Sequence, residues 1–164
     1  ATGVRGMKLD EDDATDEVIG MICVNDPERE TVLVVSEKGK GKRSVVDDYR
    51  VTNRGGKGVK TLNITEDTGN VVAIKAVTEE QDLMIINKSG ITIRLRISDV
   101  NVQGRATQGT RLIDLKKRND VISSVCLVPA EEEEEEVHEA NTAEAPETIT
   151  EENTTEPNVP EQGE

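Results

Sequence analysis

The stretch TVLVVSEKGKGKRSVVDDYRVTNRGGKGVKTLNI, residues 31–64, decides the fold because the chain contains two versions of it. Residues 82–115, DLMIINKSGITIRLRISDVNVQGRATQGTRLIDL, align with it without a gap at a spacing of 51 residues. The alignment pairs Gly39 with Gly90, Arg43 with Arg94, Asp48 with Asp99, Arg54 with Arg105, and Gly58 with Gly109. Self-similarity at a fixed period is typical of repeat architectures.

Both flanks of this stretch recur as well. The segment that opens each repeat occurs at 18–24, 71–77 and 121–128, and the segment that closes it occurs at 3–9, 58–64 and 109–115. Each repeat reads as four short strands, predicted at 18–24, 31–36, 41–46 and 58–64, and again at 71–77, 82–87, 91–98 and 109–115. Gly39 and Gly90 are predicted to form tight turns, because glycine adopts positive φ angles without steric cost.

Four strands in about 51 residues predict an all-β, propeller-like fold of four-stranded blades, with about two full blades present. The WD40 version is excluded because the chain contains no Trp. The predicted organisation is the end of a preceding blade and a linker at 1–17, blades at 18–64 and 71–115, an opening or closing strand of a further blade at 121–128, and a tail at 129–164.

Acidic residues concentrate in this tail. Residues 131–164 hold 14 of the 34 Asp and Glu residues and no Lys or Arg, so residues 1–130 are formally neutral. The tail lacks hydrophobic periodicity and cannot bury enough apolar surface to offset its ordering entropy, so disorder is expected over 129–164. We hypothesise that Glu131–Glu136 compete for a basic surface; a solubilising role is the alternative.

No residues assemble a catalytic or metal site. The single histidine, His138, lies in the acidic tail, and Cys23 and Cys126 have no ligands at metal spacing, so small, buried, free thiols are expected. The GGKGVKT segment is not a Walker loop, because Val59 separates Gly58 from Lys60 and a strand follows. No cofactor or metal is expected here. The chain also shows no membrane span and no signal segment, and its missing initiator Met suggests part of a longer protein.

Cations recur at matching positions, where folding itself requires no charge. The predicted DNA-binding residues are Arg5, Arg43, Arg54, Lys57, Lys60, Arg94, Arg105 and Arg111, with a secondary set of Lys38, Lys40, Lys42, Arg50 and Arg96. Equivalent positions of radially arranged blades form a basic rim, and cations and backbone N–H groups bind phosphates. Tyr49 is the only aromatic residue, which argues against base stacking and favours duplex DNA bent around the rim. For any one cation, a solvated strand face is the alternative.

The motifs ATGVRGMKL, EKGKGKRSVVDDYRVTNRGGKGVKTL and NKSGITIRLRISDVNVQGRATQGTRLI, followed by an acidic tail, closely resemble the C-terminal domain of the A subunit of bacterial DNA gyrase. The resemblance covers residues 1–128. It implies a β-pinwheel that wraps duplex DNA and supports ATP-dependent negative supercoiling. Residues 54–58 match the last five positions of the family's hallmark box, but Thr52 and Asn53 replace its first two, which indicates a late-blade relative of the box.

The resemblance also implies partners and location. The expected partners are double-stranded DNA, the rest of the gyrase A subunit, and the B subunit, in a heterotetramer in the bacterial cytoplasm at the nucleoid. Catalytic residues, ATP and Mg²⁺ would belong to other parts of this type II topoisomerase. Two alternatives stay open: the corresponding domain of topoisomerase IV, and a non-enzymatic propeller that serves as a protein-interaction scaffold.

Overall fold

The computed structural model describes residues 2–115 and 119–130. The sequence predicts disorder over 129–164 and competition for a basic surface by Glu131–Glu136. From residue 131 onward, these predictions concern residues outside the described part of the chain. Within the described residues, no helix has the length and apolar character needed to cross a bilayer.

Among the described residues, the regular secondary structure is mostly strand. The helical elements are two short 3-10 turns, η1 (Val46–Asp48) and η2 (Ile97–Asp99), which occupy matching positions of the two repeats. The predicted all-β class is confirmed.

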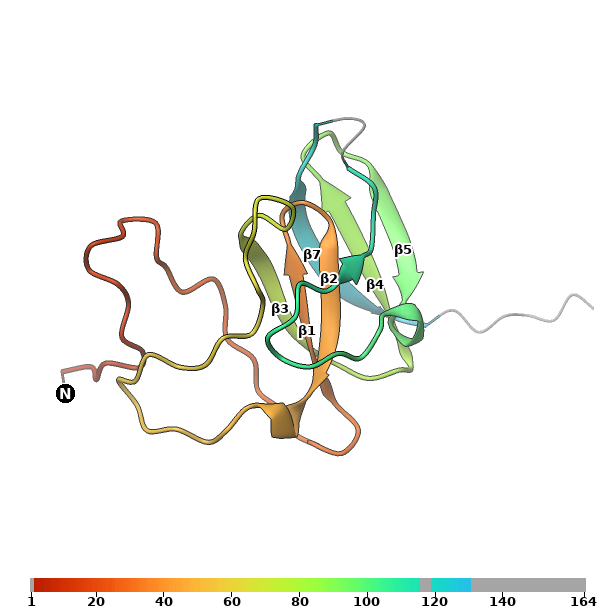
Figure 1. Ribbon diagram of the computed structural model, residues 1–164. Helices are drawn as coiled ribbons and strands as arrows, with labels where there is room; N and C mark the ends of the chain where they lie inside the picture. The colour runs from red at the N-terminus through yellow and green to blue at the C-terminus, as the bar shows by residue number, and fades with distance from the viewer. Residues whose placement is uncertain (1, 116–118, 131–164) are drawn as a thin grey trace, which may run out of the picture. The chain divides into compact units, whose positions relative to one another are not determined.

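One sheet contains four antiparallel strands in the order β3-β1-β2-β6 (Figure 1). Its strands are β1 (Thr31–Ser36), β2 (Lys40–Val45), β3 (Val71–Val77) and β6 (Thr110–Arg111). The register places Leu33 of β1 between Arg43 of β2 and Lys75 of β3. The short β6 pairs with the outer side of β2, with Arg111 opposite Lys40.

The other sheet contains three antiparallel strands in the order β5-β4-β7. Its strands are β4 (Gln81–Asn87), β5 (Thr92–Arg96) and β7 (Ile122–Pro129). Leu83 of β4 lies between Leu95 of β5 and Leu127 of β7. Along β5 the exposed and half-buried residues alternate, as the sequence predicts.

Each sheet takes strands from two successive repeats. The strand β3 opens the second repeat but pairs with β1 of the first, and β7 pairs with β4 in the same way. Both pairings shift register at the same repeat position, after Val35 and after Ile86. The sheets therefore do not coincide with the sequence repeats 18–64 and 71–115. The two central strands of a repeat pair instead with opening and closing strands of the repeat that follows.

The predicted strands at 18–24 and 58–64 are wrong for this chain, and the same exchange explains why. By this pattern both segments would pair with strands of an earlier repeat, and among the described residues neither segment joins a sheet. The segments lie instead on the face of the four-stranded sheet, where Ile22 and Leu62 pack close to Val34.

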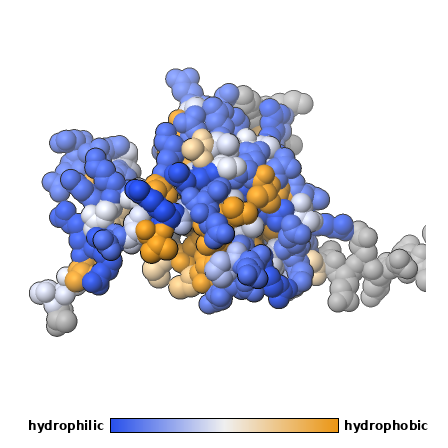
Figure 2. Space-filling model, turned by 60° about the horizontal axis from the view of Figure 1, so that its bottom comes forward, coloured by the Kyte–Doolittle hydropathy of each residue, from blue (hydrophilic) through white to orange (hydrophobic). Residues whose placement is uncertain are grey.

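Several hydrophobic side chains remain exposed along these unpaired segments. Val18, Ile19 and Met21 are exposed, and so is Val51, in the stretch between η1 and 58–64. Figure 2 shows hydrophobic patches among the hydrophilic residues on one face of the molecule. Their exposure follows from the missing pairing rather than from a polar sequence.

The main core contains residues of both sheets. Its largest fully buried members include Leu33, Leu83, Ile85, Ile97 and Val100. The strand β1 is buried on both faces, since Leu33 and Val35 belong to this core while Val32 and Val34 belong to a second cluster. Burial of each such aliphatic side chain contributes roughly 1.5–3 kcal/mol.

Both predicted glycine turns are confirmed. Gly39 and Gly90 have φ angles of 83° and 86°, a region that side chains with a Cβ atom rarely adopt. The amide of Gly39 donates to the carbonyl of Ser36, and the amide of Gly90 donates to that of Asn87, each at 3.1 Å. These turns reverse the chain between β1 and β2 and after β4.

The two cysteines are free, but the expectation that they are buried is wrong. Cys23 and Cys126 are both exposed. Cys23 lies in the segment 18–24, which forms no strand, and Cys126 lies on β7, an edge strand of its sheet. Burial of this repeat position depends on neighbours that neither residue has.

Candidate nucleic-acid interface

Successive repeats meet where the closing segment of one lies beside the glycine-containing loop of the next. At the first junction the amide of Lys8 donates to the carbonyl oxygen of Gly56 at 2.9 Å. At the second junction the amide of Asn63 donates to the carbonyl oxygen of Thr107 at 3.0 Å. The two hydrogen bonds occupy equivalent repeat positions, so the fold builds the same contact twice.

The second junction brings two predicted DNA-binding residues together. The Nη1 atom of Arg105 donates a hydrogen bond of 2.8 Å to the carbonyl oxygen of Lys60. The Lys60 side chain is exposed and forms no hydrogen bond or ion pair with any residue in the described part of the chain. The Arg105 guanidinium therefore lies against the Lys60 backbone, in a part of the surface where the Lys60 side chain is also exposed.

The first junction holds the equivalent pair, Arg5 and Arg54. The amide of Gly55 donates to the carbonyl of Gly6 at 2.9 Å, which aligns the residues that follow each arginine. Both arginines are exposed, and within residues 2–115 and 119–130 neither side chain has a hydrogen-bond or ion-pair partner. Their guanidinium groups are therefore available to an external anion.

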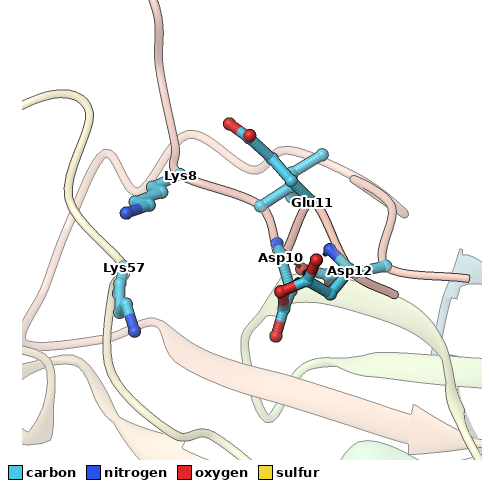
Figure 3. A pocket seen from close by; sticks show the side chains of 7 residues that line it. Lys8, Asp10, Glu11, Asp12 and Lys57 are labelled. Atoms are coloured by element: carbon cyan, nitrogen blue, oxygen red, sulfur yellow. Dashed lines mark hydrogen bonds between the residues drawn. The ribbon is translucent and has the colours of Figure 1, made fainter. Parts of the chain in front are cut away.

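An acidic loop faces part of the first junction across a pocket of about 390 Å³. Figure 3 shows Lys8 and Lys57 on one side of this pocket and Asp10, Glu11 and Asp12 on the other. Among the residues that the structure describes, no His, Cys, Asp and Glu residues form a group that could hold a metal ion. Lys57 thus shares its pocket with carboxylates, whereas Arg5 and Arg54 do not line it.

Arg111, the third residue of the set that includes Arg5 and Lys60, lies on β6 opposite Lys40. Its Nη1 atom is 3.7 Å from a carboxylate oxygen of Asp114, and the Lys40 ammonium is 3.5 Å from the side-chain oxygen of Gln108. Exposed ion pairs of this kind contribute at most about 1 kcal/mol. Arg111 thus remains a surface cation at the sheet edge, whereas Lys40 is half-buried on β2.

Arg43 is a structural residue rather than a surface cation, which corrects its prediction as a DNA ligand. Its side chain is 5% exposed. Its Nε atom donates to the carbonyl of Val100 at 2.7 Å, Nη2 donates to that of Ser98, and Nη1 pairs with Glu79 at 3.1 Å. The guanidinium thus satisfies one carbonyl within η2 and one directly after it.

Lys42 is also buried, which corrects its prediction as a secondary DNA-binding residue. Its ammonium donates to the carbonyl oxygen of Gly104 at 2.6 Å and to that of Arg105. Desolvation by burial lowers the pKa of this ammonium. A side chain enclosed in this way makes no direct contact with DNA.

The remaining predicted cations are in mixed settings. Arg94 pairs with Asp82 at 2.8 Å and donates to the carbonyl of Pro129 at 2.8 Å, so it links β4, β5 and β7. Lys38 is exposed and donates to the carbonyl of Glu66. Arg50 and Arg96 are exposed.

Sequence reasoning identified the cations but missed how they meet. It did not place Arg5 beside Arg54, or Lys60 beside Arg105, because each pair joins two different repeats. It also omitted Lys8, which lines the pocket at the first junction. The one signal available was the third copy of the closing segment at 3–9, which indicates that closing segments and loops alternate along the chain.

The family model for the DNA gyrase C-terminal domain, a beta-propeller, matches residues 1–25, 30–78 and 81–127. The chain belongs to this family. Among its relatives, a DNA gyrase A subunit from Staphylococcus aureus is 48% identical over 142 residues, which cover 87% of this chain and 16% of the relative. One from another strain is 49% identical over 135 residues, 82% of this chain and 15% of the relative. The chain thus spans about a sixth of these relatives.

Solved structures agree with the gyrase family. A structure of a DNA gyrase A C-terminal domain is 30% identical, with a TM-score of 0.68 over 76% of this chain and 41% of its own. A C-terminal domain of DNA topoisomerase IV is 19% identical, with a TM-score of 0.69 over 77% of this chain and 38% of its own, which shows a shared fold. The resemblance to the gyrase domain and the propeller-like fold are confirmed.

Proposed function

We propose that this chain is a duplex-DNA-binding and DNA-wrapping module of the A subunit of DNA gyrase. The observation that carries the proposal is the repeated junction, where surface cations of two successive repeats lie together. Arg5 with Arg54 forms one such pair, and Lys60 with Arg105 forms the other. Two equivalent cation pairs, one repeat apart, suit a ligand whose negative charges also repeat.

The phosphate backbone of duplex DNA is such a ligand. Neutralising its phosphates releases condensed counterions, which drives binding without reading sequence. Bending 20–30 base pairs costs on the order of 1–6 kcal/mol, and phosphate binding at successive junctions would offset that cost. Wrapping therefore requires several junctions in series, and a single cation pair would not suffice.

The wider setting follows from the gyrase relatives. In this proposal the chain acts in a heterotetramer that contains the rest of the A subunit, the B subunit, and duplex DNA, in the bacterial cytoplasm at the nucleoid. The wrapped DNA supports negative supercoiling driven by ATP hydrolysis, with ATP and Mg²⁺ bound in other parts of the assembly. The contribution of this chain is to hold and bend the duplex.

Two alternatives make different predictions. A topoisomerase IV domain shares the fold, but the higher identity to the gyrase A subunit favours the gyrase assignment. A protein-interaction scaffold would not need surface cation pairs without acidic partners. Salt dependence separates a scaffold from a DNA-binding module, because only phosphate neutralisation makes the logarithm of affinity fall linearly with the logarithm of salt concentration.

The test measures the affinity of the complete gyrase A subunit for a long DNA duplex at salt concentrations from about 50 to 200 mM. The double variant Lys60→Ala/Arg105→Ala should reduce the salt slope by about 2, one for each phosphate that is no longer neutralised. The control variant Arg29→Ala/Lys88→Ala removes two exposed cations outside the junctions and should change the slope little. Binding by the unmodified subunit that does not depend on salt would contradict the proposal.

A further inference from the structure

We propose that Lys42 is a positioning residue for the DNA-binding surface, whose buried ammonium fixes the loop 103–107 and thereby holds Arg105 beside Lys60. The inference rests on the proposed function, since it assigns Arg105 to the phosphate contact. It assigns to Lys42 an indirect role, because a fully buried side chain cannot touch DNA.

The contacts of β2 carry this inference. The Lys42 ammonium donates to the carbonyls of Gly104 and Arg105, and Ser44, also fully buried, donates its hydroxyl to the carbonyl of Gln103 at 2.8 Å. Between them, the carbonyl of Arg43 accepts from the amide of Gln103 at 2.8 Å, and its amide donates to the carbonyl of Asn101, just before the loop, at 3.0 Å. Three consecutive residues of one strand thus fix the backbone on which Arg105 stands.

The loop needs a donor at this point. The Arg105 carbonyl accepts from the Lys42 ammonium, and the Gly104 carbonyl accepts from it and also from the amide and hydroxyl of Thr107. A carbonyl that loses its donor is costly where water does not replace it, and an aliphatic side chain at position 42 would remove the lysine donor from the Arg105 carbonyl. The Arg105 guanidinium then binds the carbonyl of Lys60, so the loop is held at its backbone and at its side chain.

Comparison of the two repeats shows that the sheet itself does not require this amine. The position equivalent to Lys42 in the second repeat is Ile93 on β5. In the sheet order of the described strands, β5 lies at an edge, without a neighbour corresponding to β6. Lysine occurs where a loop packs against the strand, and isoleucine occurs where none does.

The experiment measures, at fixed salt, the affinity of the complete subunit for a long duplex. Lys42→Met keeps the length of the side chain and removes its donors. It should weaken binding to about the same extent as Arg105→Ala, and it should have no further effect in an Arg105→Ala background. The absence of a further effect in the Arg105→Ala background shows that Lys42 acts through Arg105. A general loss of structure would instead weaken binding equally in both backgrounds and overturn the inference.

A second pair of variants protects the test if Lys42→Met does not fold. Ser44→Ala and Ser36→Ala each remove a fully buried hydroxyl that donates to a carbonyl, but only Ser44 contacts the loop. Ser44→Ala should weaken binding through Arg105, and Ser36→Ala should not. Equal effects of the two serine variants would overturn the inference. Loss of salt-dependent binding in the unmodified subunit would instead overturn the proposed function.

Discussion

The guanidinium of Arg105 and the backbone carbonyl of Lys60, 45 residues apart in sequence, are joined by a hydrogen bond of 2.8 Å. The bond links two successive repeats at a point where both side chains are positively charged. In the proposed function, both charges also bind the phosphate backbone of DNA. The structural and functional cations of this chain can be separated experimentally on that basis.

Arg43→Met should reduce stability without removing a DNA contact. The change leaves the carbonyls of Val100 and Ser98 without their donor, at a cost of about 1–3 kcal/mol in the free energy of unfolding. Denaturant unfolding of the chain measures this loss. The control Glu79→Gln removes only the exposed partner and should cost less than about 1 kcal/mol. A change in salt slope for Arg43→Met in folded protein would contradict the assignment.

Gly109→Ala should destabilise the edge of the four-stranded sheet. Gly109 has a φ of 75°, and an added Cβ would lie 2.7 Å from the carbonyl oxygen of Gly41 on β2. A residue with a side chain in this conformation costs of order 1–3 kcal/mol before the clash is counted. Gly104→Ala provides the control, since nothing lies within 4 Å of its added Cβ. Thermal unfolding that shifts equally for both variants would refute this explanation.

Leu83→Ala should test the shared core. Leu83 is fully buried in the cluster that contains residues of both sheets, so the truncation should cost about 2–5 kcal/mol in unfolding free energy. Val51→Ala should change stability by less than about 0.5 kcal/mol, because Val51 is fully exposed. Urea denaturation compares the two, and similar losses would show that the core is misassigned.

The stability of the chain should depend on pH through Lys42. Burial lowers the pKa of Lys42 below its usual value of 10.5, Arg105 lowers it further, and Asp48 acts in the opposite direction. Between the lowered value and 10.5 the unfolded chain binds more protons than the folded chain, so stability rises with pH in that window.

Comparison with Lys42→Met isolates this effect from the other titrating groups. The free energy of unfolding of the unmodified chain should rise relative to that of the variant as the pH approaches 10.5. Unfolding curves recorded from neutral to alkaline pH provide the measurement. A difference that stays constant or shrinks across this window would show that the Lys42 ammonium is not desolvated.

The repeat predicted the fold class and the glycine turns because those depend on local sequence. The positive φ of Gly39 and the alternation along β5 are properties of a few neighbouring residues. Strand exchange could not be predicted, because a 51-residue period is the same whether β1 pairs with 18–24 or with β3. The spacing of similar segments in the sequence therefore does not show which repeat a strand pairs with.

The candidate site was only partly predictable for the same reason. Arg43 and Arg94 recur at one repeat position, which resembled a functional pattern, yet both form ion pairs, with Glu79 and Asp82. A recurring cation can thus reflect recurring packing as well as recurring ligand contacts. Only three-dimensional pairing separates these from Lys60, whose side chain has no partner in the described residues.

The most direct test of the account is a double-mutant cycle on duplex-DNA affinity, measured at fixed salt with the complete subunit. Lys60→Ala and Arg105→Ala belong to one junction, and their losses should be non-additive by about 0.5 kcal/mol or more. The pair Arg5→Ala and Arg105→Ala belongs to different junctions and should be additive within about 0.5 kcal/mol. Additive losses for Lys60 and Arg105, or no loss for either, would contradict coupled phosphate binding by the two cations at the junction between repeats.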